Sequence, residues 1–123
     1  MKIEKFEDIK AWQEARKLTI ILYTITAREK FRKDFALCDQ IKRAAISVMA
    51  NIVEGFDSQS DIEFIKFLIY ARRSATEIQS HLYIALDTGY ITDKEFNGFY
   101  IKLTEIKNLL NGFIRYLKKE RQK

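Results

Sequence analysis

The sequence contains no proline and only four glycines among its 123 residues. These two residues most often interrupt helices, so their scarcity favours long, continuous helices. No run of about 18 apolar residues is present, so the sequence predicts no membrane span. The first residues, Met1 to Asp8, lack the apolar segment of a signal peptide.

Cysteine and histidine occur once each. A lone Cys38 cannot form an internal disulfide, which suits a reducing compartment, and we expect a cytoplasmic protein in which Cys38 is a small packing residue. His81 has no nucleophile turn or phosphate-binding loop to accompany it. Glu77 lies four residues before His81, but di-iron bundles need Glu-x-x-His on two helices, so we interpret this pair as a helix-surface contact. We therefore expect no enzymatic activity, no metal and no cofactor.

The balance of charge is basic, with 22 Lys and Arg against 17 Asp and Glu, a net charge of +5. This permits an anionic partner such as nucleic acid, but it also suits plain solubility. Apolar residues make up 47% of the chain, about 58 residues. Core-facing helices need roughly three apolar positions in seven, about 41 in all. The surplus favours a second buried surface between subunits over scattered surface hydrophobes.

Apolar periodicity predicts four helices, over residues 9–28, 36–54, 61–88 and 93–119. Short loops force neighbouring helices to run antiparallel, so the expected fold is all-α: an up-down-up-down antiparallel four-helix bundle in one domain, 1–123. Two long hairpins that swap with another chain stay open as an alternative. Expected cap and end residues are Asp8, Gly55, Gly89 and the capping boxes Ser60-x-x-Glu63 and Thr92-x-x-Glu95.

The charged segment Arg28 to Asp34 breaks the periodicity and is predicted to be the first loop, with Phe31 and Phe35 packing it onto the bundle end. In the fourth helix, Gly98 and Gly112 lie off the apolar stripe. Each costs roughly 1 kcal/mol against Ala in a helix. Close approach by another helix and simple drift on an exposed face are both consistent with these glycines.

The second helix is apolar over most of its circumference, as expected of a buried helix. Its first stripe is Ile41, Ala44, Ala45, Val48 and Ile52, and its second, the candidate subunit interface, is Ile46, Met49, Ala50 and Val53. Ile20, Ile21 and Tyr23 of the first helix are further candidates for that interface. A polar seam separates the stripes and must find partners, since unpaired buried polar groups are costly: Gln40, Arg43, Ser47, Asn51 and Glu54. We expect Arg43 to pair with Glu77 and to hold the two helices in register.

Basic residues gather in clusters that are candidate nucleic-acid contacts: Lys30, Arg32 and Lys33 in the first loop, Arg72 and Arg73 in the third helix, and Lys118, Lys119, Arg121 and Lys123 in the tail. Lys42, Arg43, Arg72 and Arg73 are expected at one height of the bundle. For Arg72 and Arg73, phosphate binding and a structural role are equally open. The loop and the tail should lie at opposite ends, so useful avidity would need repetition of each cluster in an oligomer. No recognition helix, zinc module or aromatic RNA-binding sheet motif is present, which predicts weak sequence preference.

Several motifs carry a family resemblance: Trp12-Gln-Glu-Ala15, Gln40-Ile-Lys-Arg-Ala-Ala-Ile-Ser47, Asn51-Ile-Val-Glu-Gly55, Ala71 with Ser74 and Glu77, and Gly89-Tyr-Ile91. The chain resembles, over roughly residues 6–114, the four-helix-bundle family of 23S ribosomal RNA intervening-sequence proteins, whose relatives include the accessory variability protein of diversity-generating retroelements. The string in the second helix is the most specific of these motifs.

The resemblance implies a bacterial four-helix bundle that assembles into a ring, a pentamer being favoured, without enzymatic activity. It also implies RNA or DNA as a partner, and a reverse transcriptase for retroelement-associated members. The chain departs from the family pattern at Arg32, where the family usually has Pro, and at Arg73, where it usually has Gly. These departures bear on the loop geometry and on the subunit packing. A protein-binding adaptor or scaffold without a nucleic-acid role is the alternative.

Overall fold

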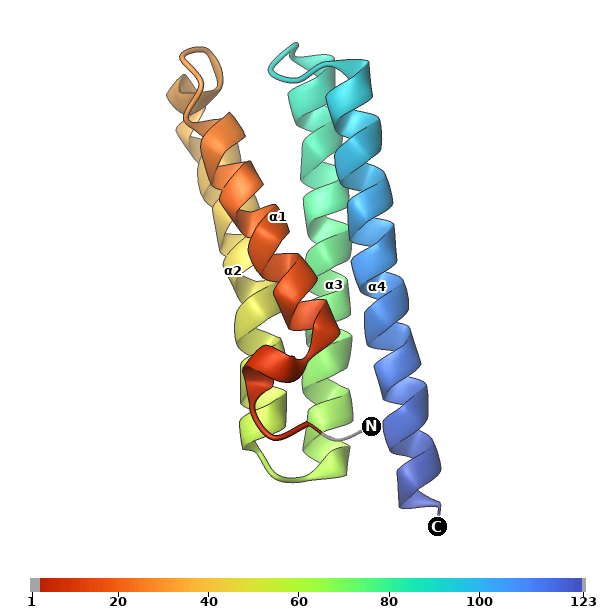
Figure 1. The fold of residues 1–123 in the computed structure, drawn as a ribbon. Coiled ribbons are helices and arrows are strands. Elements are labelled where there is room, and N and C mark those ends of the chain that lie inside the picture. The colour runs from red at the N-terminus through yellow and green to blue at the C-terminus, as the bar shows by residue number, and fades with distance from the viewer. Residues whose placement is uncertain (1–2, 123) are drawn as a thin grey trace.

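The computed structural model describes residues 3–122, and in that range the chain forms helices and no strands. The helices are α1 (Lys10–Thr26), α2 (Phe35–Asp57), α3 (Asp61–Asp87) and α4 (Asp93–Arg121), with short 3-10 helices η1 (Phe6–Asp8) and η2 (Phe31–Lys33). They run alternately up and down in an antiparallel four-helix bundle (Figure 1). The expected fold class is therefore confirmed. None of the helices within 3–122 has the length and hydropathy needed to cross a bilayer.

The predicted apolar stripes form the core. The first stripe of α2 is buried throughout, from Ile41 to Ile52. The apolar stripe of α4 is also buried except at Phe99, which is half-buried: Phe96, Phe99, Leu103, Ile106, Leu110, Phe113 and Leu117. Apolar spacing in α3 predicts a stripe that begins at Ile65, but the buried residue at the start is Phe64, and Ile65 is only half-buried. Phe64 packs edge-on against Phe113 of α4, with ring centroids 4.9 Å apart, so the larger aromatic side chain fills this end of the core.

Gly55 does not end α2, as the sequence had suggested, but lies buried inside it. A Cβ atom at this position would meet Phe64 Cδ1 at 2.7 Å and Phe67 Cβ at 3.0 Å. The absence of a side chain therefore allows α2 and α3 to approach closely, and α2 continues to Asp57. The left-handed turn residue after α2 is Gln59, with φ of 56°.

The other helix ends follow local hydrogen bonding. Gly89, with φ of 79°, ends α3 as predicted, and Tyr90 N donates to Ala85 O while Gly89 N donates to Leu86 O, the two bonds of a Schellman motif. The Thr92–Glu95 capping box is complete at the start of α4. At α3 the Ser60 hydroxyl accepts from Glu63 N at 3.3 Å.

Asp8 is not the N-cap of α1, contrary to expectation. It ends η1, and its carboxylate accepts hydrogen bonds from Glu4 N at 3.2 Å and Lys5 N at 3.3 Å. Ile9 takes the N-cap position without a side-chain bond. Both bonds go to the Oδ2 atom, so the carboxylate binds the backbone that precedes η1 rather than the start of α1.

Contacts between the two loops at one end of the bundle hold that end together. Phe31 is fully buried and stacks on Tyr90 with centroids 4.8 Å apart, and the Tyr90 hydroxyl donates to Asp34 Oδ2 at 3.1 Å. Arg28 donates to both carboxylate oxygens of Glu95, at 3.1 and 2.5 Å. Phe31 thus packs the loop as predicted, whereas Phe35 points to solvent and does not.

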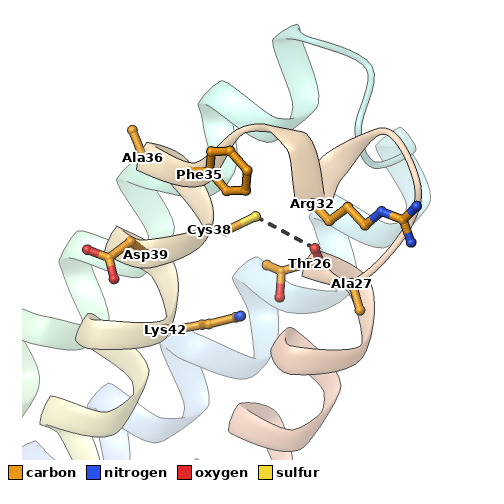
Figure 2. Close-up of a pocket in the computed structure, with 8 residues that line it drawn as sticks. All are labelled: Thr26, Ala27, Arg32, Phe35, Ala36, Cys38, Asp39 and Lys42. Atoms are coloured by element: carbon orange, nitrogen blue, oxygen red, sulfur yellow. Dashed lines mark hydrogen bonds between the residues drawn. The ribbon is translucent and has the colours of Figure 1, made fainter.

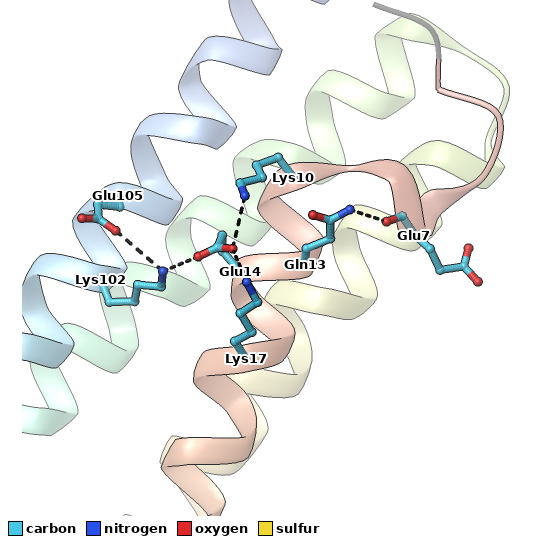
Figure 3. A network of polar contacts seen from close by, with 7 residues as sticks. All are labelled: Glu7, Lys10, Gln13, Glu14, Lys17, Lys102 and Glu105. Atoms are coloured by element: carbon cyan, nitrogen blue, oxygen red, sulfur yellow. Dashed lines mark hydrogen bonds and ion pairs between the residues drawn. The ribbon is translucent and has the colours of Figure 1, made fainter.

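A buried carboxylate, Glu14, connects α1 with α4 (Figure 3). It accepts from Lys102 of α4 and, at 3.1 Å, from Lys17, while Lys10 lies 3.6 Å away. The Lys102 and Lys17 bonds hold the pKa of the Glu14 carboxyl at about 2, below its ordinary 4.5. A charged network therefore closes the bundle where α1 meets α4.

We predict that Gly55→Ala destabilises the protein by about 1–3 kcal/mol, because the new methyl group would overlap side chains whose positions are fixed by packing. Gly98→Ala is the matched control, since nothing lies within 4 Å of a Cβ there. That substitution should stabilise α4 by up to about 1 kcal/mol. Urea unfolding of both variants measures the difference. Equal effects would contradict the close approach at Gly55, and loss of stability at Gly98 would indicate a neighbouring helix there.

We predict a second, acid-dependent effect at Glu14. A carboxyl whose folded pKa is lowered stabilises the fold fully above its unfolded pKa of 4.5, and loses that contribution as the pH falls toward about 2. Glu14→Gln should therefore lower the free energy of unfolding near neutral pH by about 1–3 kcal/mol. The difference from the unmodified protein should shrink through that acid window.

Glu105→Gln is the control, because Glu105 is exposed and lies 3.8 Å from the same lysine. Its effect should stay within about 0.5 kcal/mol. Chemical denaturation at several pH values makes the measurement. If Glu14→Gln lowered the free energy of unfolding as much at pH 2 as at neutral pH, the charge of Glu14 would not be the source of its stabilising effect.

Candidate functional site

The polar seam of α2 is divided between two environments. Ser74 of α3 donates to Ser47 Oγ at 2.9 Å, and Asn51 Nδ2 donates to Ser47 O at 2.8 Å and Ser47 Oγ at 3.0 Å. These three residues connect α2 with α3. Gln40 and Glu54 of the seam are exposed.

Arg43 does not pair with Glu77, and this prediction was wrong. Its Nε donates to Asp39 Oδ2 at 2.7 Å on the same helix, both side chains are exposed, and Glu77 is exposed on α3. A residue four positions away on an exposed helix face offers a shorter reach than the neighbouring helix. Register between α2 and α3 is instead fixed by the Ser47–Ser74 bond.

That register also separates the four basic residues that were expected at one height. Because Ser47 lies level with Ser74, Arg43 lies roughly one turn toward the first loop, while Arg72 and Arg73 lie toward the other end. Arg72 is half-buried and donates to Asn111 Oδ1 of α4 at 2.7 Å, which is a structural role. Arg73 is exposed, with its guanidinium 5.9 Å from the centroid of the Tyr70 ring.

The remaining candidate contacts form two clusters at opposite ends of the bundle, as Figure 1 shows from the positions of η2 and the C-terminus. The first-loop cluster is Lys30, Arg32 and Lys33, and the tail cluster is Lys118, Lys119 and Arg121. All six are exposed and, within residues 3–122, none takes part in an ion pair. Lys123 lies outside the described residues.

Beside the first-loop cluster lies an open depression between the end of α1 and the start of α2, with a volume of about 820 Å³. Its lining residues are Thr26, Ala27, Arg32, Phe35, Ala36, Cys38, Asp39 and Lys42. In Figure 2 the Lys42 side chain extends from α2 toward α1, whereas Asp39 points away from it. The Lys42 ammonium lies 5.1 Å from the centroid of the Tyr23 ring.

Cys38 is a packing residue rather than a nucleophile. The buried Sγ donates to Phe31 O at 3.2 Å and Thr26 O at 3.6 Å (Figure 2). Burial raises the pKa of the thiol. Since the thiolate is the reactive form of cysteine, this environment disfavours nucleophilic chemistry.

A second candidate surface is the apolar outer face of α1 and α2. The Lys42–Tyr23 contact joins these antiparallel helices, and Ile20 and Ile46 each lie about one turn from it along their own helix. Ile20 is 61% exposed and Ile46 50%. Ala50 is exposed, and Met49 and Val53 are half-buried. We call this set, together with Tyr23, the α1–α2 outer face.

Sequence reasoning missed two buried polar residues. Glu14 lies in the apolar stripe of α1 between Ala11 and Leu18, and its lysine neighbours at Lys10 and Lys17 were the available signal. Gln79 of α3 donates to Tyr100 O at 3.2 Å and Thr104 Oγ1 at 3.1 Å, and accepts from Lys107 at 2.9 Å. It occupies an apolar-stripe position where a polar side chain needs partners on α4.

The described residues hold no group of three His, Cys, Asp or Glu side chains that could ligate a metal ion. His81 is half-buried, and its Nε2 atom is enclosed without a hydrogen-bond partner among the described residues.

Comparison with known proteins identifies the family of the chain. A search of curated proteins found no match. A solved structure from Bacteroides thetaiotaomicron, a protein of unknown function from the S23 ribosomal protein family, is 29% identical with a TM-score of 0.76. The match covers 85% of this chain and 97% of that one. The family model for the 23S rRNA-intervening sequence protein matches residues 7–112, so the chain belongs to the 23S rRNA-intervening sequence protein family.

Proposed function

We propose that this protein is a non-enzymatic bundle that assembles into a cytoplasmic homo-oligomeric ring and binds RNA with weak sequence preference. The observation that carries the proposal is the set of six exposed basic side chains, in the first-loop and tail clusters, without ion pairs in the described part of the chain. When basic side chains of a protein bind the phosphates of a nucleic acid, the counterions condensed on that nucleic acid are released. Arg73 adds an exposed cation between the two clusters.

Assembly of several subunits into a ring would strengthen this binding. The two clusters lie at opposite ends of one bundle, so a single subunit offers only a few phosphate contacts at each end. A ring repeats each cluster around its axis, and linked weak contacts gain avidity. The α1–α2 outer face is the surface that such an assembly would bury, and a pentamer is the ring size that the family resemblance favours.

The alternative is an adaptor that uses the same apolar face to bind a different protein, such as a reverse transcriptase. The exposure of Ile20 and Ile46 is compatible with either partner. Dependence on salt separates the two functions, because phosphate contacts weaken steeply as salt rises and apolar docking does not.

We predict that the isolated protein is an oligomer at micromolar concentration. Light scattering should give a mass several times 14.6 kDa. Ile46→Glu should shift the protein toward the monomer, because a buried charge on the α1–α2 outer face would be unpaired. Ile84→Glu, at an equally exposed isoleucine of α3, is the control. If the unsubstituted protein were a monomer, the proposed oligomeric ring would be wrong.

We predict that RNA binding falls at least tenfold between about 50 and about 200 mM salt. Replacing Lys30, Arg32 and Lys33 with Gln should weaken structured RNA and duplex alike, and deleting residues 118–123 should weaken binding only in part. The control removes the same charge at Lys66, Lys94 and Arg115, which are exposed and far apart in sequence. Filter binding makes the measurement. No binding at low salt, or tight binding that ignores salt, would favour the adaptor.

A further inference from the structure

Phe35 is 80% exposed, more than any other large apolar side chain in the described part of the chain. It is the first residue of α2, directly after the N-cap Asp34, whose carboxylate accepts from Leu37 N at 3.1 Å and from the Tyr90 hydroxyl at 3.1 Å. The backbone that carries the ring is therefore fixed by a capped helix. An exposed aromatic ring on a fixed backbone offers a face on which a planar group can stack.

Two cationic side chains lie beside that ring, while the carboxylate of Asp34 is used by the helix cap and by the Tyr90 hydroxyl. Arg32 and Lys42 line the same depression. The one acid of the lining, Asp39, is neutralised by Arg43 at 2.7 Å and points away from the space (Figure 2). The Lys42 ammonium lies 5.1 Å from the centroid of the Tyr23 ring. This combination of a stacking ring and unpaired cations suits a planar group that carries a phosphate.

The floor of the depression has little left to recognise a base edge. The Thr26 hydroxyl donates to Leu22 O at 2.8 Å and lies 3.1 Å from Tyr23 O. The Cys38 thiol is taken by Thr26 O and Phe31 O. With these donors used internally, stacking and phosphate contacts remain, and neither distinguishes one base from another.

We propose that the depression binds one unpaired nucleotide of an RNA, with its base stacked on Phe35 and its phosphate contacted by Arg32 and Lys42. The volume of about 820 Å³ is within the range of small-ligand sites. A base inside a duplex is covered on both faces by its neighbours, so the site selects single-stranded segments. The inference deepens the proposed function and rests on it.

The test measures fluorescence anisotropy of a dye-labelled, unstructured RNA oligonucleotide and of a duplex RNA of the same length, at low salt. Phe35→Ala should weaken binding of the single strand roughly tenfold and leave the duplex within about twofold. Phe35→Trp should retain binding of both, because it keeps an aromatic face. Ile62→Ala is the matched control, an exposed apolar residue at the start of α3, at the other end of the bundle.

The outcomes distinguish a failure of the nucleotide site from a failure of the proposed function. If the unmodified protein binds both RNAs and Phe35→Ala changes neither, or weakens both equally, the nucleotide site is wrong and the proposed function stands. If the unmodified protein binds neither RNA, both are wrong. If Phe35→Ala changes the mass measured by light scattering, the Phe35 side chain contacts another protein subunit, and the nucleotide site is again wrong.

Discussion

The close approach of α2 and α3 is the constraint on which the rest of the structure depends. Packing between these two helices is the most extensive in the bundle. It requires Gly55 at one point, where any side chain would overlap Phe64, and the serine pair Ser47 and Ser74 at another. Small residues let two helices come near, and near helices allow a direct hydrogen bond between short hydroxyl side chains. α1 and α4 then pack onto this pair.

The outer pair of helices is joined in a different way. α1 and α4 share less packing than α2 and α3. The Glu14–Lys102 contact connects the two helices directly, and Arg28, in the loop after α1, pairs with Glu95 of α4. Hydrogen bonds from Lys102 and from Arg28 lower the pKa of the two carboxyls to about 2 in each case. The stability of this side of the bundle therefore depends on ionised carboxylates, which ties it to pH in a way that the apolar core is not.

The interior of the bundle is closely packed. The cavity at its centre, lined by apolar side chains and Thr19, has a volume of only about 10 Å³, at the lower limit for a single water molecule. The features that could engage a partner are all at the surface: the α1–α2 outer face, the basic clusters and the depression beside Phe35. Membership of the 23S rRNA-intervening sequence protein family agrees with this picture, since the family supplies a fold and no established reaction.

The sequence by itself determined the four helices, their antiparallel order and nearly all of the core, because apolar periodicity at 3.6 residues reports directly on which face is buried. It also determined the end of α3 and the start of α4, since Gly89 and the Thr92–Glu95 box act through bonds within a few residues. A helix end can be predicted from the sequence when the residues that bond to it lie within a few positions.

Only the tertiary structure decided features whose partners lie far away in the chain. Gly55 carries the same sequence signal as a helix-ending glycine, and the packing of Phe64 against it decided that α2 continues. The sequence offered Arg43 a distant acid, Glu77, and a near one, Asp39, and the structure pairs it with Asp39. Phe31 and Phe35 are both aromatic residues near one loop, yet Tyr90 stacks on the first, whereas the second is 80% exposed. The burial of a side chain depends on what the rest of the fold places against it.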